Sequence, residues 1–276
     1  MEIPHGIIIC MVICIGILLA WRITMRREGR YAGGYDTGMS MTIGDRELQE
    51  DCYAVELSGE GVLAVLADGM GKQFGGKIAA RIAVETFQKL FQSYNSFDNP
   101  NYYFNKAFFA ANRNILNAVE ESRGAASAAV ALVQGDKLYY ATVGNVKIAI
   151  FRDGDLIPVT AGHTVDRLAQ ERYNQGRLTR EDAISLLEEH RLYNYVGQDS
   201  FQDIEYFDEP VRLKKQDYII LMSDGIYETL SWRQLEECLS VKGSCQEKAY
   251  SMVELINKSE MAEKDNGSVV ILERKI

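Results

Sequence analysis

The chain has 276 residues, 47% of them hydrophobic, which is enough apolar material for one large domain with a sizeable core. A net charge of −9 argues against a nucleic-acid-binding surface, and a content of only four prolines argues against long disordered stretches. The five cysteines form no metal-binding or redox pattern, so we expect free thiols in a reducing compartment.

The N-terminal segment is almost wholly apolar. Gly6 to Trp21 carries no charge and, with its apolar neighbours, approaches the roughly 20 residues that span a bilayer. Basic residues follow at Arg22, Arg26, Arg27 and Arg30, and the positive-inside rule then places the rest of the chain in the cytoplasm. We therefore predict a transmembrane anchor within residues 1–30 and a single-pass protein of the cell membrane. A signal peptide and a packed core helix are the alternatives.

The predicted domain, residues 31–276, begins with strands and then changes to a helical period. The expected strands are Met39–Ile43, Cys52–Leu57 and Val62–Ala67. Apolar residues at helical spacing then predict a helix over Gly75–Tyr94 and a second amphipathic helix from Phe104 to Val119. We expect this pair to form an antiparallel hairpin that lies on a sheet.

An antiparallel meander and a polar insertion follow. The meander strands are Ser127–Val133, Leu138–Val143 and Lys147–Phe151, and Asp-Gly sequences mark its turns. The insertion, about residues 162–197, has only short helical patterns. A segment of this kind between strands is more often a lid or a docking surface than part of a core.

The last part of the chain returns to strands and paired helices. Strands are expected at Asp208–Leu213, Tyr218–Met222 and Ser268–Glu273, and capping boxes at Ser231–Gln234 and Ser244–Glu247 predict two helix starts. Long antiparallel runs with helices in pairs predict a layered α+β domain, not a doubly wound parallel sheet.

Acidic residues stand at the ends of several predicted strands. Asp68 and Asp224 each end an apolar strand in an Asp-Gly turn, Asp265 precedes the last strand, and Glu50-Asp51 precedes Cys52. Each position alone is a weak signal, because an isolated Asp-Gly is usually only a turn. Together they predict one shared site. Oxygen ligands without His or Cys suit Mg²⁺ or Mn²⁺, not zinc or copper.

From about Tyr35 to Ile276, the chain resembles the PPM family of metal-dependent protein phosphatases, the 2C type. The order and spacing of several short segments carry the resemblance: RELQED at 46–51, DGMG at 68–71, VGNVKIAIFRDGDL at 143–156, GHTVDRL at 162–168, YNYVG at 193–197, MSDGIYETL at 222–230 and DNGSVVIL at 265–272. The resemblance implies a four-layer α-β-β-α sandwich, in which helix pairs flank two antiparallel sheets and a metal centre lies in a cleft at one end.

The resemblance also assigns roles to residues. Asp68 would bridge two Mn²⁺ or Mg²⁺ ions; Asp224 and Asp265 would complete the shell of one ion. Glu50 or Asp51, with the Gly69 carbonyl, would serve the other ion. Arg46 stands where the family places its phosphate-binding arginine, and a guanidinium fork matches two phosphate oxygens. The competing interpretation of Arg46 is a surface ion pair with Glu50.

Some residues depart from the family pattern. Asn145 stands where relatives usually have Asp, and a neutral amide ligates Mg²⁺ less well than a carboxylate, so we expect a weakened third metal site. If that site is weakened but not lost, Asn145→Asp should raise the rate. Lys72 and Gln73 replace the usual residues after DGMG. Met70 replaces a histidine proposed as general acid in some relatives. His163 is expected to be hydrogen-bonded within the lid rather than to reach the substrate.

Two functions fit these residues. The first is an active, membrane-tethered serine/threonine phosphatase that hydrolyses phosphoproteins with a metal-activated water, with a membrane kinase or its targets as partners. The second is a pseudophosphatase that binds or regulates phosphoproteins without turnover, which Asn145 favours. The retained acidic residues favour the enzyme, because a chain relieved of catalysis has little reason to keep a cluster of repelling carboxylates.

Overall fold

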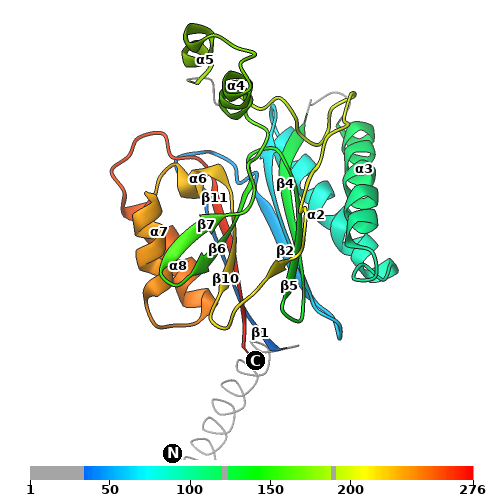
Figure 1. Ribbon diagram of the computed structural model, residues 1–276, viewed down its shortest axis with the longest axis vertical. Coiled ribbons are helices and arrows are strands. Elements are labelled where there is room, and N and C mark those ends of the chain that lie inside the picture. The colour runs from blue at the N-terminus through cyan, green and yellow to red at the C-terminus, as the bar shows by residue number, and fades with distance from the viewer. Residues whose placement is uncertain (1–33, 120–123, 188–190, 276) are drawn as a thin grey trace, which may run out of the picture.

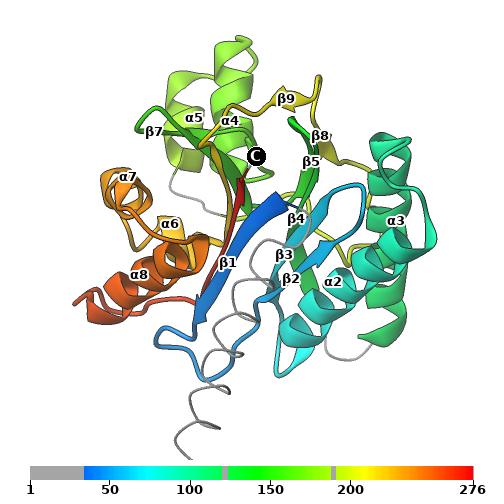
Figure 2. The same ribbon diagram turned by 90° about the horizontal axis from the view of Figure 1, so that it is seen from below.

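The computed structural model describes residues 34–119, 124–187 and 191–275. Figure 1 and Figure 2 show the elements in two perpendicular views. In chain order, they are β1 (Tyr35–Thr42), β2 (Cys52–Leu57), β3 (Val62–Met70), α2 (Gly75–Ser93), α3 (Pro100–Ala118), β4 (Ala125–Gln134), β5 (Lys137–Val143), β6 (Lys147–Arg152), β7 (Asp155–Pro158), α4 (Val165–Asn174), α5 (Arg180–Leu187), β8 (Glu205–Tyr206), β9 (Val211–Arg212), β10 (Tyr218–Met222), α6 (Asp224–Tyr227), α7 (Trp232–Ser240), α8 (Cys245–Lys258) and β11 (Gly267–Arg274).

The strands of the described residues pair into two antiparallel sheets. One sheet has the strand order β1-β11-β10-β6-β7, and the other has the order β2-β3-β4-β5-β8, with β9 also paired to β5. Helices α2 and α3 lie on the outer side of the second sheet, and α7 and α8 on the outer side of the first (Figure 1, Figure 2). The predicted α+β class and four-layer sandwich are therefore confirmed.

The buried side chains of the described residues fall into three apolar clusters, one at each junction between layers. Phe87 and Phe104 belong to the cluster between α2, α3 and their sheet. Leu66 and Leu221 lie in the cluster between the two sheets, and Met252 lies in the cluster under α7 and α8. Strand β3 contributes to two of these clusters, which explains why its sequence is a continuous apolar run instead of an alternation.

The two capping boxes predicted from the sequence are confirmed. Ser231 and Ser244 are the N-caps of α7 and α8, and each forms the reciprocal capping box that the sequence predicts, with Gln234 and Glu247 respectively. The predicted strand Asp208–Leu213 is wrong in extent, because only Val211–Arg212 pairs as β9. Pro210 precedes it and has no N–H to donate to a ladder.

The predicted localisation needs correction. Within the ranges that the structure describes, no helix is long and apolar enough to cross a membrane. The proposed anchor, Gly6 to Trp21, lies outside the described residues. The interpretation as a single-pass protein of the cell membrane is therefore contradicted.

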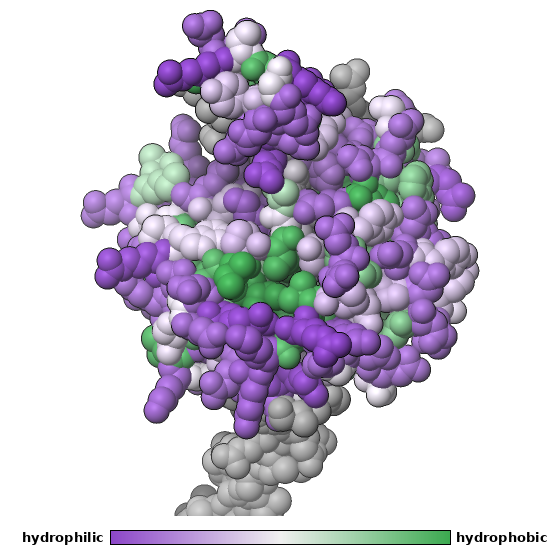
Figure 3. Space-filling view, in the orientation of Figure 1, coloured by the Kyte–Doolittle hydropathy of each residue, from purple (hydrophilic) through white to green (hydrophobic). Residues whose placement is uncertain are grey.

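The insertion projects from the sandwich. Figure 1 shows α4 and α5 beyond the end of the sheets, on the same side as α6, and Figure 3 shows that this projection is mostly hydrophilic. Of the side chains described in α4 and α5, Ala169 and Ala183 are buried. The start of β1 pairs with the end of β11, through Tyr35 and Arg274, and lies at the opposite end of the sandwich (Figure 1).

The aromatic cluster beneath α3 gives a test of the packing. The Phe108 ring is fully buried and meets Phe87 edge-on, with ring centroids 4.8 Å apart. Phe108→Ala is expected to lower the free energy of unfolding by about 3–5 kcal/mol, because lost apolar burial and a cavity add together. Denaturant unfolding measures the change.

Phe109→Ala provides a matched control on the same helix. Phe109 is 43% exposed and has its ring contact with Phe201. The control should lose far less stability than the buried variant. Equal losses for the two variants would contradict the assigned helix face.

Candidate active site

The acidic residues singled out from the sequence meet in one cleft of about 520 Å³. The predicted site residues that line it are Arg46, Glu50, Asp68, Gly69, Asn145, Asp224 and Asp265. Asp51 is the exception, since it lies buried outside this lining. Residues from widely separated parts of the chain therefore converge on a single concave surface.

The ends of both sheets build this cleft. Asp68 lies near the end of β3, directly opposite Ser127 of β4. In the other sheet, β10 pairs with β11 up to Met222 and Val269, so Asp224, just after β10, and Asp265, just before β11, come to the same edge. The antiparallel register of each sheet fixes where its carboxylates stand.

Gly69 is required by a close approach of two backbones. A Cβ at this position would lie 2.2 Å from the carbonyl oxygen of Gly76 and 2.7 Å from that of Glu50. The start of α2 and the chain around Glu50 can therefore press against the end of β3 only because residue 69 has no side chain. This contact places Glu50 beside Asp68.

Asp68 lies at the centre of the electrostatics. Asp68 is half-buried, and burial raises its pKa well above the ordinary value, with the nearby carboxylates of Asp224, Asp51 and Asp265 raising it further. Burial also raises the pKa of Asp224, and Asp265 adds to that shift. Without a cation, these groups repel one another and favour protonation.

Glu50 and Asp51 occupy different positions. Glu50 lines the cleft, and burial raises its pKa. Asp51 lies behind it, where it accepts a hydrogen bond of 2.9 Å from the Ser223 hydroxyl, and burial raises its pKa to about 7. Among the described residues, neither Glu50 Oε1 nor Asp51 Oδ1 has a hydrogen-bond partner, although both atoms are buried.

Arg46 forms an ion pair with Asp265, not with the Glu50 of the competing interpretation. Its Nε and Nη2 atoms donate to the two carboxylate oxygens of Asp265 at 2.9 and 2.7 Å. The expected alternative, a pair with Glu50, is not the arrangement found. Arg46 remains 59% exposed, so its guanidinium lies at the mouth of the cleft.

Asn266 is a positioning residue that sequence reasoning missed. Its side-chain oxygen accepts a 2.7 Å hydrogen bond from the Glu50 N–H, and its amide nitrogen donates to the Ile43 carbonyl at 2.8 Å. It thereby ties the loop that carries Arg46 and Glu50 to the start of β11. The Asp265-Asn266-Gly267 sequence contained this signal, but only its aspartate was interpreted.

The cleft fits divalent cations. Its candidate ligands are carboxylate and carbonyl oxygens, which Mg²⁺ and Mn²⁺ prefer. A cation site seen in the protein alone should have carboxylate oxygens without hydrogen-bond partners and carboxylates with raised pKa values. Glu50 and Asp51 each have one such oxygen, and the pKa of Asp68 is raised. We therefore regard Glu50, Asp68, Asp224 and Asp265 as candidate ligands that face the cleft, with Asp51 behind them.

A second group with metal-ligand chemistry is already balanced by a protein cation. Asp36, Cys245 and Glu273 are buried and approach one another closely. Lys275 forms ion pairs with Asp36, at 3.7 Å, and with Glu273. This group lies at the end of the sheet where Tyr35 pairs with Arg274, away from the cleft.

His163 has a structural role at the base of the insertion. His163 is buried, and its Nδ1 accepts a hydrogen bond of 3.1 Å from the Gly144 N–H, so it fastens the base of the insertion to the turn between β5 and β6. Gln73 has a φ of 55°, which is unusual for a residue with a side chain. Met70 lines the cleft and has no group that titrates.

The insertion contributes to the cleft through the residues that follow α5. Arg191, Leu192 and Tyr195 line it opposite the acidic residues. The cleft is thus bounded on one side by the strand ends and on the other by the returning end of the insertion. Sequence reasoning did not assign these three residues to the site.

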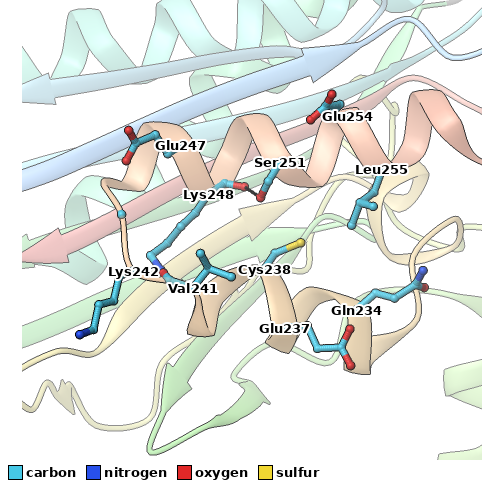
Figure 4. A pocket seen from close by; sticks show the side chains of 11 residues that line it. Gln234, Glu237, Cys238, Val241, Lys242, Glu247, Lys248, Ser251, Glu254 and Leu255 are labelled. Carbon is cyan, nitrogen blue, oxygen red and sulfur yellow. Dashed lines mark hydrogen bonds between the residues drawn. The ribbon is translucent and has the colours of Figure 1, made fainter.

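Another hollow lies between α7 and α8, with a volume of about 310 Å³ (Figure 4). Figure 4 shows the Lys248 side chain reaching from α8 toward the backbone at Val241. Its ammonium donates to the Leu239 and Val241 carbonyls and so caps α7. This hollow shares no lining residue with the acidic cleft, and its buried cation has a structural role.

Comparisons with known proteins agree on one family. The family model described as protein phosphatase 2C matches residues 38–257. A serine/threonine phosphatase, stp, of Listeria welshimeri is 23% identical over 221 residues, which is 78% of this chain and 85% of the relative.

Solved structures share the fold. The Streptococcus agalactiae serine/threonine phosphatase aligns with a TM-score of 0.74 at 22% identity, over 87% of this chain and 99% of that chain. The catalytic domain of the serine/threonine phosphatase PstP, solved with two manganese ions, aligns with a TM-score of 0.69 at 22% identity, over 87% of this chain and 97% of that chain.

The raised pKa values predict how pH affects the metal-free protein. The folded protein holds protons on Asp51 and its neighbours that the unfolded chain has already lost, so its free energy of unfolding decreases as pH rises from about 4, the ordinary Asp value, to about 7. We expect the melting temperature in a chelator to fall across this window. Mn²⁺ should reverse the fall, most strongly at the upper end.

Asp68→Asn is the matching control for this measurement. It removes one of the coupled carboxylates, so its melting temperature should depend less on pH. A wild-type melting temperature that is flat or rises over this window would contradict the proposed electrostatics.

Proposed function

Because the chain belongs to the protein phosphatase 2C family, we propose that it is a metal-dependent protein serine/threonine phosphatase that hydrolyses phosphate monoesters on proteins. The cofactor is Mn²⁺ or Mg²⁺. The observation that carries the proposal is the convergence of Asp68, Asp224, Asp265 and Glu50 on one cleft. A carboxylate cluster of this kind destabilises the folded protein unless cations occupy it, so its retention supports a catalytic role.

The protein ligands are assigned by their positions. Asp68 interacts with Asp51 as well as with Asp224 and Asp265, which suits a residue shared by two ions. Gly69 brings its backbone against Glu50, and we propose that its carbonyl serves the ion on that side. Glu50 faces the cleft while Asp51 stands behind it, so we assign direct ligation to Glu50 and support of the site to Asp51.

Divalent cations held by Glu50, Asp68, Asp224 and Asp265 would supply an activated water and would stabilise the charge on the phosphoryl oxygens. The chain itself supplies the charge and geometry around this chemistry. Its carboxylates would hold the ions, and the strand registers keep those carboxylates in place. Met70 offers no proton at the cleft, so we propose that solvent protonates the leaving alkoxide.

We propose that Arg46 binds the substrate phosphate. Its guanidinium lies at the mouth, and its two donors already engage a pair of carboxylate oxygens, a geometry that two phosphate oxygens can reproduce. Once a cation satisfies Asp265, the same fork becomes available to substrate. The exchange of Asp265 for phosphate would couple metal binding to substrate binding.

The insertion at about residues 162–197 is proposed to act as a lid. It projects at the cleft end of the sandwich, is mostly hydrophilic, and sends Arg191 and Tyr195 into the cleft wall (Figure 1, Figure 3). Phosphoproteins are the proposed partners, and a kinase that phosphorylates the same substrates would oppose the enzyme.

A pseudophosphatase remains the competing function. Asn145 and the Arg46–Asp265 pair favour it, because an amide donor on Asp224 and a guanidinium on Asp265 each satisfy a carboxylate without a metal ion. The retention of the other carboxylates favours the enzyme. Turnover of a phosphorylated peptide separates the two, since a binding module would hold the peptide and release no phosphate.

Asp68→Asn tests the enzyme directly. Loss of the central carboxylate should reduce Mn²⁺-dependent hydrolysis of p-nitrophenyl phosphate by more than about 100-fold, because even residues that only support metal ligands cost about 10- to 100-fold when removed. Asp153→Asn is the matched control, as Asp153 lies in an exposed turn and pairs with Lys214. The proposal fails if wild-type protein releases no phosphate with Mn²⁺, or if Asp68→Asn retains the wild-type rate.

Arg46→Lys tests the phosphate role separately. It preserves the charge but removes the planar fork, so KM for a phosphothreonine peptide should rise by about 10-fold. Arg233→Lys, on the exposed face of α7, should leave KM unchanged. If Arg46→Lys changes neither KM nor kcat, Arg46 is only a structural partner of Asp265.

A further inference from the structure

Asn145 joins the two sides of the cleft. Its Nδ2 donates a hydrogen bond of 2.8 Å to Asp224 Oδ2, and its Oδ1 accepts one of 2.7 Å from the Ser127 hydroxyl. Asp224 begins α6 after one sheet and Ser127 lies in β4 of the other. The amide therefore connects a candidate metal ligand to the opposite sheet.

The orientation of the amide is determined by its neighbours. The Asn145 backbone N–H donates to the Ser127 oxygen at 3.3 Å, which leaves the Ser127 hydroxyl proton to donate onward to Oδ1. With Oδ1 satisfied in this way, Nδ2 is the atom that faces Asp224. The reverse orientation would bring two acceptor oxygens together at that contact, which is unfavourable.

The backbone of Asn145 is also fixed. Tyr227 donates from its hydroxyl to the Asn145 carbonyl at 2.9 Å, and Tyr227 ends the same short helix that Asp224 begins. The preceding residue, Gly144, has a φ of 95°, and a Cβ there would lie 2.2 Å from the Ser127 oxygen. Asn145 is thus held from both sides before any ligand arrives.

The Asn145 amide stabilises the Asp224 carboxylate, a role that a cation would otherwise have to fill. Asp224 is half-buried, and its neighbour Asp265 repels it. A donor N–H placed 2.8 Å from Asp224 Oδ2 offsets part of this repulsion without adding charge. An aspartate at residue 145 would put a second carboxylate at that contact, which is tolerable only with a cation between the two.

We propose that Asn145 is a positioning residue that holds Asp224 in place of a cation, so that this cleft takes two divalent cations and not three. The inference rests on the proposed function for its metal chemistry. The hydrogen bond itself does not, because it is present in the protein alone. Asp224 is therefore set in its working orientation before metal binds.

The first experiment compares melting temperatures of the full chain in a chelator. Asn145→Asp should melt lower than wild type by about 4 °C or more, because two carboxylates then face each other. Excess Mn²⁺ should raise the melting temperature of Asn145→Asp by more than that of wild type. Asn105→Asp, on the exposed side of α3, is the control and should match wild type.

The second experiment counts bound Mn²⁺ by calorimetric titration. Wild type should bind two ions per chain, and Asn145→Asp should bind a third. Ser127→Ala is the alternative variant if Asn145→Asp does not fold. It removes the hydrogen bond to the Asn145 amide without adding charge, so it should lower kcat while the number of bound Mn²⁺ ions stays at two.

The outcomes are distinct. Equal metal-free melting temperatures for wild type and Asn145→Asp, or three ions bound to wild type, would overturn the role of Asn145. A wild-type chain that binds no Mn²⁺ would overturn the proposed function and the two-ion count together. The melting comparison in chelator would then still decide whether Asn145 holds Asp224.

Discussion

The structure depends on bringing like charges together at the junction of two sheets. Asp68 comes from one sheet, while Asp224 and Asp265 come from the other. Asp224 and Asp265 raise the pKa of Asp68, and Asp265 also raises the pKa of Asp224, so bringing these carboxylates together is electrostatically unfavourable. What holds them is the pairing of β3 with β4 and of β10 with β11, since a register shift in either pair would move a carboxylate out of the cleft. The scaffold therefore holds the carboxylates close together against their mutual repulsion, which a bound cation would reduce.

The apolar layers supply the stability that this arrangement requires. The described core includes a cluster at every layer junction, and β3 belongs to two of them. A strand buried on both faces is difficult to displace, which makes β3 a suitable carrier for Asp68. The neutral groups around the cleft complete the arrangement. Asn266 ties down the loop of Glu50, and Asn145 steadies Asp224.

Much of this architecture could be predicted because its signals are local. The capping serines of α7 and α8, the continuous apolar run of β3 and the acidic ends of the strands are each visible within a few residues. The pairing of Arg46 with Asp265 could not be predicted from the same signals. It depends on the path of the loop before Glu50, which Asn266 fixes from a distant part of the chain. The membrane interpretation used only the length and hydropathy of an apolar run, and among the described residues no helix is long and apolar enough to cross a membrane.

The position of the first described strand has a practical meaning. Tyr35 lies beside Arg274 at the pole of the sandwich that faces away from α6 and the projecting insertion (Figure 1). The described part of the chain therefore begins on the side of the molecule remote from the mouth. A bulky protein substrate can approach the mouth along the long axis without meeting the end of the sandwich where Tyr35 lies.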